Sequence, residues 1–470
     1  MFSSRLPKDI SPSPFFAELE RVKACAKKDA AEGGLSFIDM TVSSPVRAGL
    51  PIDLNAAVDE GRESFGCWNP DAAGWKSVRE TVVEYYRERS GNFTAGQIIL
   101  TASTSEAYSV LFKTFCDPGD VILTPMPGYP LLDTLAQLEH LECAPYFLKL
   151  TRERLRGPSA KLRDLKKSAV LEPKANHKFT EPAEVNSFRY VLDTDSLLAA
   201  PERAKILLLV SPHNPTGHCI SREEWNAAVR FCEENDMILV VDEVFGDYAF
   251  MDKVKHTWEY VFGLCPPEPS LSQSSPSKSF STEGRESVHC RFNDFWDAGG
   301  GDFINLPENG PKCPIFWLNG LSKAVGSPQL KLGWMAFYAP RERFEEIRAA
   351  LEFVEDAYLS VSAPAQALGS ALLKQSAAYE SQVKERLLAN WQTLREAFPS
   401  KYCPDVLGGW YAVVRLGEDD EDLTLRLLCE KHVLVQPGFF FDFDEDGWVV
   451  ISLLQEPALF KEAVRRMADR

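Results

Sequence analysis

Three polar side chains that could do chemistry each follow an apolar stretch of the chain. Asn214 lies in the turn 211-SPHNPTGHCISREEW, Asp242 closes the run MILVV, and Lys323 follows PIFWL in 319-NGLSKAVGSPQLKLGW. Each apolar stretch is typical of a buried strand, and open α/β sheets bind ligands where such strands end. A lysine amine at such a place can act as a nucleophile or move a proton. We therefore expect these side chains to meet in one site.

Taken singly, each of the three has an ordinary structural explanation. Asn214 is a common turn former, Asp242 could cap the next element, and most lysines are solvated surface residues. An accidental occurrence of all three in this order and spacing is improbable.

The ordered set resembles the transferases of fold type I that depend on pyridoxal 5′-phosphate (PLP), and the class I/II aminotransferases most closely. The motifs are NPTG, then Asp–Glu after a hydrophobic strand, then S-K followed eight residues later by a cation and G-W. The resemblance covers roughly residues 37–455 apart from two insertions. It implies an α/β fold, in which a large domain with a mainly parallel seven-stranded sheet flanked by helices is joined by a smaller α+β domain.

The resemblance implies a role for each polar side chain around the cofactor ring. Lys323 would form a Schiff base, the internal aldimine, with the cofactor aldehyde and later move the Cα proton of the substrate. Asp242 would keep the pyridine nitrogen protonated, and Asn214 would donate to the ring oxygen O3′. Tyr129, in 125-PMPGYP, would stack on the face of the ring.

The cofactor phosphate needs hydrogen-bond donors, which a helix N-terminus supplies. The segment 101-TASTSEAY resembles the phosphate loop of the family, so Ser103, Thr104 and Ser105 are expected to bind the phosphate. Lys331 takes the place of the family's phosphate-binding arginine, where it can supply a point charge but not a bidentate fork.

Four positions depart from the family pattern, and one of them concerns the substrate. Phe245 and Trp68 stand where many members have tyrosine, and Gly320 replaces a phosphate-binding Ser or Thr. Val450 replaces the arginine that clamps the substrate α-carboxylate. Because an unpaired carboxylate is costly in a closed site, either the substrate lacks one there or another cation holds it. Arg47, in 41-TVSSPVRAGLP, is the candidate for that cation.

Helical and strand patterns alternate from about residue 75 to 340, which predicts a mainly parallel sheet. Two stretches without clear periodicity interrupt the pattern and are interpreted as insertions. The predicted organisation is a large PLP-binding domain at 60–340 with insertions at about 151–186 and 264–312, and a small domain formed by 1–59 and 341–470.

The composition favours a cytoplasmic enzyme. With 470 residues, 45% of them hydrophobic, the chain can bury a large core. Its 51 basic and 68 acidic side chains give a net charge of −17, which argues against nucleic acid and anionic membranes as partners. No apolar run approaches a membrane span, and the start MFSSRLPKDI lacks the apolar region of a signal peptide. Eleven cysteines without a CxxC pair indicate free thiols rather than disulfides or a metal site.

These features predict a PLP-dependent aminotransferase that moves an amino group from an amino acid donor to a 2-oxo acid. A lyase or decarboxylase of the same fold stays open, because small pocket changes separate these activities. A regulator with a non-catalytic, aminotransferase-like sensor is disfavoured by the charge and by the roughly forty residues before 37-FIDMTVSSP. The resemblance also implies a homodimer with active sites at the interface.

Overall fold

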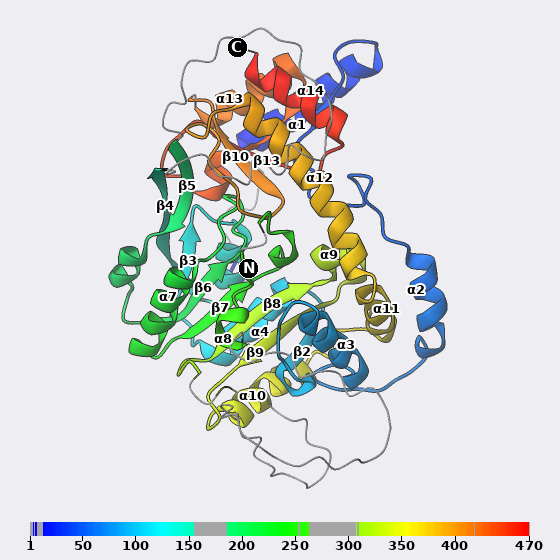
Figure 1. Cartoon of the computed structure of the whole chain (residues 1–470), viewed down its shortest axis with the longest axis vertical. Helices are drawn as coiled ribbons and strands as arrows, with labels where there is room; N and C mark the ends of the chain where they lie inside the picture. The colour runs from blue at the N-terminus through cyan, green and yellow to red at the C-terminus, as the bar shows by residue number, and fades with distance from the viewer. Residues whose placement is uncertain are drawn as a thin grey trace, which may run out of the picture.

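A central sheet with helices on both faces and a smaller sheet beside it make up the molecule (Figure 1). The computed structural model describes residues 13–154, 186–251, 254–262, 310–417 and 419–469, together with Ser3, Arg5, Leu6 and Pro307. Within these ranges, no helix is both long and apolar enough to cross a membrane.

The central sheet has eight strands in the spatial order β2-β9-β8-β7-β6-β3-β4-β5. From β4 through β3, β6 and β7 to β8, all neighbouring strands are parallel, whereas β9 and β5 run antiparallel to their neighbours. The sheet is therefore mainly parallel, as the resemblance implied. The strands are β2 (Ile98–Thr101), β3 (Val121–Met126), β4 (Glu142–Arg154), β5 (Asn186–Leu192), β6 (Ala204–Val210), β7 (Ile238–Asp242), β8 (Ile315–Gly320) and β9 (Gly333–Tyr338).

The sheet has one strand more than the expected seven, because β5 pairs antiparallel with the second half of β4. Tyr190 and Leu192 of β5 are buried with Leu148 of β4 in the same core, which explains why the chain stays paired there. The first predicted insertion, at about 151–186, overlaps the end of β4 and the first residue of β5. Only 155–185 lies outside the described residues. Most of the second, 264–312, lies outside them as well.

Both faces of the central strands are buried, which is why their sequences are continuously apolar. In β7, Ile238 and Val240 belong to one core, and Leu239 and Val241 belong to the core on the opposite face. Because side chains alternate along a strand, Asp242 at the end of β7 points to the same face as Ile238. The helices on that face are α4 (Thr104–Phe115), α5 (Leu131–Leu138) and α10 (Phe344–Asp356).

Other helices contribute to the core on the opposite face, and one of them, α7, begins with a capping box. The Ser221 oxygen accepts from the backbone N–H of Glu224 at 3.2 Å, and the Glu224 carboxylate accepts from the Ser221 N–H at 2.7 Å. This capping box satisfies two backbone donors at the helix start. The helices are α3 (Lys76–Arg87), α7 (Arg222–Glu234), α8 (Glu259–Phe262) and α11 (Ala363–Leu373).

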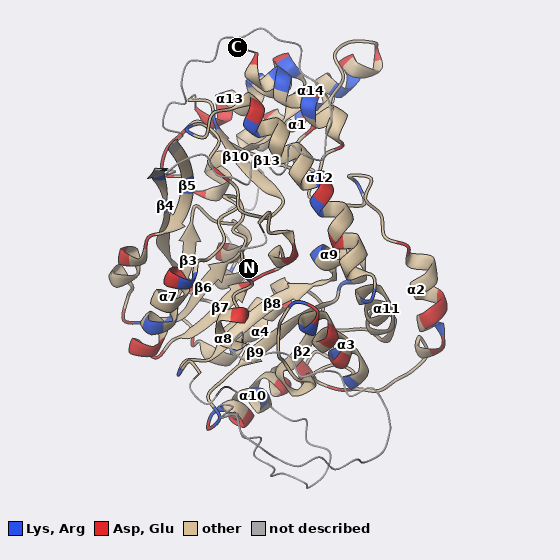
Figure 2. Cartoon of the chain, viewed as in Figure 1, with Lys and Arg blue, Asp and Glu red and all other residues tan. Residues whose placement is uncertain are grey.

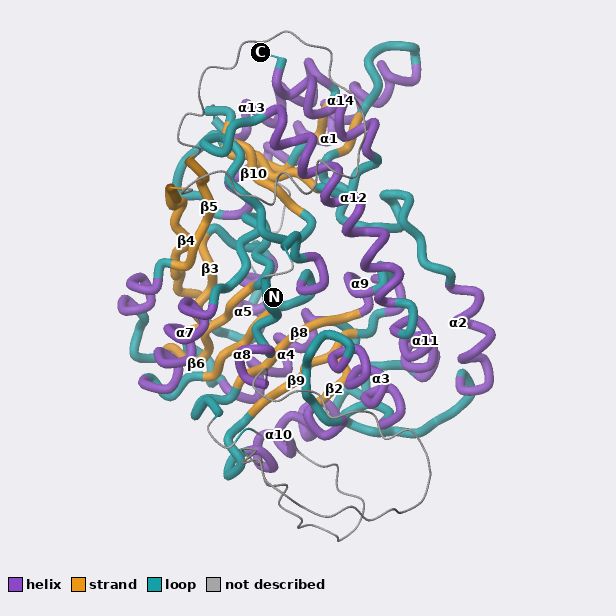
Figure 3. Tube along the Cα trace, viewed as in Figure 1, coloured by secondary structure: helices purple, strands orange, loops and turns teal. Residues whose placement is uncertain are grey.

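The smaller sheet consists of β10 (Tyr411–Arg415), β13 (Trp448–Ser452) and β12 (Gln436–Pro437), which pair antiparallel. Nearby, β1 (Ile38–Asp39) pairs in parallel with β11 (Val433–Leu434). The long helix α12 runs from the neighbourhood of α11 toward this sheet (Figure 3). The remaining helices are α1 (Pro14–Ala31), α2 (Leu54–Gly61), α9 (Leu321–Ala324), α12 (Ser376–Ala397), α13 (Asp420–Lys431) and α14 (Pro457–Ala468).

One buried apolar cluster contains residues of both sheets, such as Leu209 of β6 and Val413 of β10. Charged residues, blue and red in Figure 2, lie mostly on the outer helices, and the central strands contain few of them. The predicted division into two domains at 59 and 341 stays a prediction. Short 3-10 helices lie at Arg62–Ser64, Ala95–Gln97, Thr194–Ala199, Gly246–Tyr248, Pro328–Leu330 and Gly438–Phe441.

Candidate active site

A cavity of about 300 Å³ lies at the ends of β6, β7 and β8. Parallel strands end at the same edge of a sheet, so residues far apart in sequence meet there. The residues expected around a cofactor all line this cavity: Ser103, Thr104, Ser105, Tyr129, Asn214, Asp242, Lys323 and Lys331.

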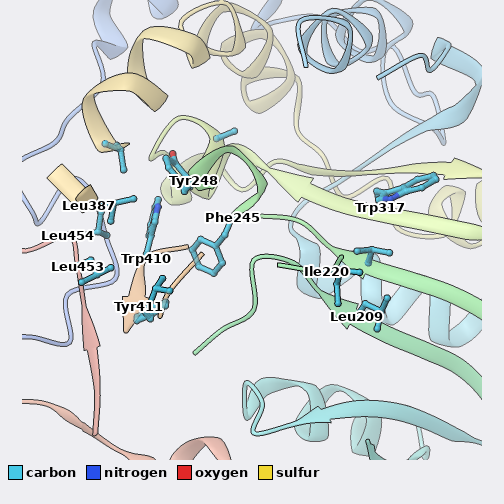
Figure 4. Packing of buried hydrophobic residues seen from close by; sticks show 14 of the residues in the cluster. Leu209, Ile220, Phe245, Tyr248, Trp317, Leu387, Trp410, Tyr411, Leu453 and Leu454 are labelled. Carbon is cyan, nitrogen blue, oxygen red and sulfur yellow. The ribbon is translucent and has the colours of Figure 1, made fainter. Parts of the chain in front are cut away.

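Lys323 lies in α9, directly after β8, and its amine faces two aromatic rings. The Nζ atom is 4.9 Å from the ring centre of Trp410 and 5.5 Å from that of Phe245, and these two rings lie side by side in the packing seen in Figure 4. Burial lowers the pKa of Lys323 to about 8, although the negative charge of Asp242 acts to raise it. A neutral lysine amine, the form that attacks a carbonyl, is therefore accessible near neutral pH.

The lowered pKa predicts a stability effect for Lys323→Met in the ligand-free protein. The folded chain releases this proton at about pH 8, whereas the unfolded chain keeps it up to 10.5. Lys323 therefore destabilises the fold below about pH 8, and this cost disappears as pH rises toward the unfolded value. We expect Lys323→Met to raise the free energy of unfolding by about 1–3 kcal/mol at neutral pH.

Urea unfolding at neutral pH and at about pH 10 measures this effect, which should shrink at the higher pH. Lys331→Met removes an exposed lysine of the same cavity and serves as the control. An equal gain for Lys323→Met at both pH values would contradict the electrostatic explanation.

Asp242 is held by two hydrogen bonds at the end of β7. The Tyr108 hydroxyl donates to Oδ2 at 2.7 Å, and the backbone N–H of Val244 donates to Oδ1 at 3.0 Å. Burial raises the pKa of Asp242, and these hydrogen bonds and the charge of Lys323 limit the rise. Each carboxylate oxygen keeps a further lone pair for a donor in the cavity.

The N-terminus of α4 supplies the anion-binding end of the cavity. Ser103 is its N-cap and accepts from the backbone N–H of Glu106 at 3.2 Å, so the Ser103 hydrogen stays free to donate. The helix dipole favours negative charge at this end, where Thr104 and Ser105 also line the cavity. Lys331 adds a cation from the segment before β9.

Close packing around this helix end explains the glycine at position 320. A Cβ on Gly320 would lie 3.0 Å from Gly333 Cα and 3.1 Å from the Leu332 carbonyl oxygen. A Cβ on Gly333 would in turn lie 3.0 Å from the Ser103 carbonyl carbon. The two glycines let β8 and β9 pack directly against the start of α4. Ser322 lines the cavity nearby.

Asn214 has a buried amide oxygen, Oδ1, without a hydrogen-bond partner among the described residues. Such a group costs about 1–3 kcal/mol unless a ligand or water pairs with it. Rotation of the amide group exchanges the positions of its oxygen and nitrogen atoms. Asn214 can therefore present either a donor or an acceptor. This side chain is therefore ready to bind a polar atom in the cavity.

Several residues of the cavity wall were not predicted from the sequence. Tyr108 follows Ser105 by three residues and so lies on the same face of α4, which is the signal that could have identified it. Ser43 and Tyr411 also line the cavity, from segments near the smaller sheet. No local pattern marks these two, because they are brought in by the packing of that sheet. Trp410, beside Lys323, is another such residue.

Arg47 is not among the residues that line the cavity. It is exposed and lies in the turn after Pro45. Its expected contact with a substrate carboxylate therefore has no geometric support in the described chain. The reason is local, since only Ser43 of this segment reaches the cavity. Trp68 also lies away from the cavity and is 80% exposed.

Comparisons with known proteins identify the family of this chain. Residues 68–286 and 292–467 match the family model of aminotransferase class I and II. An alanine aminotransferase of Mycobacterium tuberculosis is 24% identical over 413 residues, covering 85% of this chain and 77% of that protein. A tyrosine aminotransferase of Caenorhabditis elegans is 21% identical over 267 residues, 57% of this chain and 40% of its own length.

A crystal structure of an aminotransferase from Escherichia coli has the same fold, with a TM-score of 0.69 at 18% identity. That match covers 100% of this chain and 97% of the other. Because the family model spans well over half of the sequence, the chain belongs to the class I and II aminotransferase family.

Proposed function

We propose that this protein is an aminotransferase that binds PLP in the described cavity and moves an amino group between an amino acid and a 2-oxo acid. The observation that carries the proposal is the meeting of Lys323, Asp242 and the N-terminus of α4 around one cavity. A half-buried amine of lowered pKa, a half-buried carboxylate and an anion site are the groups that this chemistry needs.

The side chains of the cavity fit PLP. The start of α4 and Lys331 suit its phosphate, and Asp242 suits its ring nitrogen. Asn214 contributes the buried amide whose Oδ1 has no partner within the described structure, and it would contact the ring oxygen. Tyr129 would cover a face of the ring, for which its half-exposed position on the cavity wall is suitable.

When bound, PLP supplies an electron sink for the electron pair left by the Cα–H bond of the substrate. Lys323 would hold the cofactor, and its amine would move the proton at the substrate Cα. Asp242 would keep the ring nitrogen protonated, which deepens the sink. Phe245 and Trp410 pack against the amine and would exclude water from it.

On the substrate side, Val450 stands where the family has an arginine, and the hydroxyl groups of Tyr411 and Ser43 line the cavity. Tyr411 pairs with Ser452 across the smaller sheet, and Val413 pairs with Val450, so Tyr411 and Val450 share one face. Val450 is fully buried, whereas Tyr411 lines the cavity and interacts with the Ser43 hydroxyl. Burial raises the pKa of Tyr411, so it stays a neutral donor. We propose that Tyr411 and Ser43 bind the substrate.

Tyr411→Phe should raise KM for the amino donor by about 10-fold and change kcat less, because a hydrogen bond to a charged group contributes about 1.5–3 kcal/mol. Steady-state kinetics with an amino acid panel measures this. The absorbance spectrum of the bound cofactor should not change. A loss of cofactor instead of a KM effect would place Tyr411 in the cofactor site.

A single-turnover experiment tests the proposed function as a whole. An amino acid added to the PLP-loaded protein should yield equal amounts of pyridoxamine phosphate and 2-oxo acid, and a second 2-oxo acid should restore PLP. Release of ammonia or carbon dioxide with the cofactor left in its aldehyde form would show a lyase or decarboxylase instead. The ratio of products distinguishes these outcomes directly.

We also propose that the protein acts as a homodimer in the cytoplasm. Support for the dimer comes from the family and from exposed Trp68, which stands where members have a tyrosine that reaches the neighbouring subunit. Support for the compartment comes from free thiols such as Cys25, Cys67 and Cys429, which are exposed. Light scattering combined with size-exclusion chromatography measures the oligomeric state.

A further inference from the structure

One helix of this structure reaches two separate parts of the cavity. Ser103, Thr104 and Ser105 lie at the N-terminus of α4, and Tyr108 lies one turn later on the same helix. The Tyr108 hydroxyl donates to Asp242 Oδ2 at 2.7 Å. Tyr108 also lines the cavity, although its side chain is only 4% exposed. The anion-binding helix end and the support of the carboxylate are therefore about one helical turn apart on a rigid element.

We propose that Tyr108 is a positioning residue, which orients the Asp242 carboxylate toward the cofactor ring nitrogen and sets its distance from the phosphate site. This inference rests on the proposed function, because it assumes that Asp242 faces the ring nitrogen of PLP. The new claim is that the contact between Asp242 and the ring nitrogen depends on the Tyr108 hydroxyl.

The strand geometry explains why this hydrogen bond forms. Ile238 and Val240 point into the core beneath α4, and alternation sends Asp242 to the same face. Tyr108 belongs to that core as well, so its ring is fixed by apolar packing and only its hydroxyl meets a polar group. A tyrosine held in this way loses little further side-chain entropy when it binds the carboxylate.

Tyr108 can act only as a donor toward Asp242. Burial and the charge of Asp242 raise the pKa of Tyr108 well above its ordinary value, so the hydroxyl keeps its hydrogen. The Val244 N–H occupies Oδ1, and Tyr108 occupies one lone pair of Oδ2. With both oxygens fixed, the carboxylate cannot rotate freely, and its remaining lone pairs keep their directions.

Four titratable groups bear on Asp242 from the surrounding elements. Burial raises the pKa of Asp242, and the neighbouring Glu243 raises it further. The Tyr108 hydrogen bond is the first of the effects that lower it, and Lys323 of α9 also lowers it. Tyr129, from the segment after β3, faces the same charge. Without the Tyr108 donor the pKa of Asp242 should rise, so Asp242 would bind a proton at higher pH and hold the ring nitrogen less well.

The test is Tyr108→Phe, read out as the affinity of the cofactor-free protein for PLP. Titration followed by tryptophan fluorescence, from about pH 5 to about pH 9, gives the dissociation constant. We expect binding to be about 10-fold weaker at neutral pH, the size of a lost hydrogen bond to a charged group. The acidic midpoint of the binding curve should also move to higher pH. Phenylalanine keeps the ring, and thermal unfolding of the cofactor-free variant checks the fold.

A cofactor analogue isolates the ring-nitrogen contact. In 1-deaza-PLP a C–H group replaces the ring nitrogen, so Asp242 has no charged N–H to bind. The difference between wild type and Tyr108→Phe should disappear with this analogue. In an Asp242→Asn background, Tyr108→Phe should likewise cause no further loss of PLP affinity, because the carboxylate through which it acts is already absent.

Tyr146→Phe is the matched control. Tyr146 is a buried tyrosine of β4. Its hydroxyl donates to the Leu208 carbonyl oxygen at 2.8 Å rather than to Asp242. This variant should leave the PLP and 1-deaza-PLP affinities in their wild-type ratio.

The contrary results bear on two separate claims, the role of Tyr108 and the role of Asp242. Equal weakening of PLP and 1-deaza-PLP by Tyr108→Phe would overturn the inference, because the residue would then only support the structure. Unchanged PLP affinity in Tyr108→Phe, with a clear loss in Asp242→Asn, would also overturn it while leaving the proposed function intact. Wild-type protein that does not bind PLP, or that binds it no better than 1-deaza-PLP, would overturn the proposed role of Asp242 itself.

Discussion

Lys323→Met should reduce amino-group transfer by about 10⁴-fold, the upper end of what a positioned acid–base group contributes. Lys323 is the half-buried lysine of the cavity, and its amine is the group we assign both to hold the cofactor and to move the proton. Methionine has a similar length and no amine, so it removes both functions without a large cavity. Single-turnover conversion of PLP to pyridoxamine phosphate measures the loss.

Lys331→Met distinguishes the roles of the two lysines that line the cavity. It removes the cation beside the start of α4, so it should weaken PLP binding and leave covalent attachment of the cofactor intact. Borohydride reduction of the wild-type protein, followed by peptide mapping, should yield an adduct on Lys323. An adduct on any other lysine would refute the assignment.

Asp242→Asn should still bind PLP, although more weakly, and should lose activity by about 10²–10³-fold, as is typical when one fixed electrostatic contact to a developing charge is removed. The amide keeps the shape of the carboxylate but cannot hold a protonated ring nitrogen. The carbanion at Cα then loses much of its electron sink, so kcat should fall more than PLP affinity. Turnover close to that of the wild type would remove Asp242 from this role.

The neighbouring carboxylate provides the control for Asp242→Asn. Glu243 is buried as well, but it accepts from the Thr257 backbone N–H at 2.7 Å and lies outside the residues that line the cavity. Glu243→Gln should lower the free energy of unfolding and change kcat far less than Asp242→Asn. Equal losses of activity would mean that the strand end, rather than the Asp242 charge, is what matters.

The sequence alone was sufficient to predict the central strands and several of the side chains that line the cavity. Continuous apolar runs predict strands buried on both faces, and β6, β7 and β8 lie where these runs are. Because such strands end at one edge, Asn214, Asp242 and Lys323 could be expected to meet, and they do. The capping box at Ser221 and the start of α4 were also local signals, since a helix N-terminus is determined by a few adjacent residues.

Only the tertiary structure decided which side chains complete the site. The Tyr108–Asp242 hydrogen bond forms because one face of α4 packs against one face of β7. The residue types alone do not predict this pairing. Tyr411 reaches the cavity through the pairing of β10 with β13. Arg47, chosen for its charge, is exposed in a turn.

The physical reason for this division is the range of the interactions involved. Periodicity and capping act over a few residues, so they can be seen in a linear sequence. Contacts between elements depend on how those elements pack, which is set by the summed burial of many side chains across both cores. The family motifs thus located the cavity that we propose binds the cofactor, whereas the packing of α4 and of the smaller sheet determined which other side chains line it.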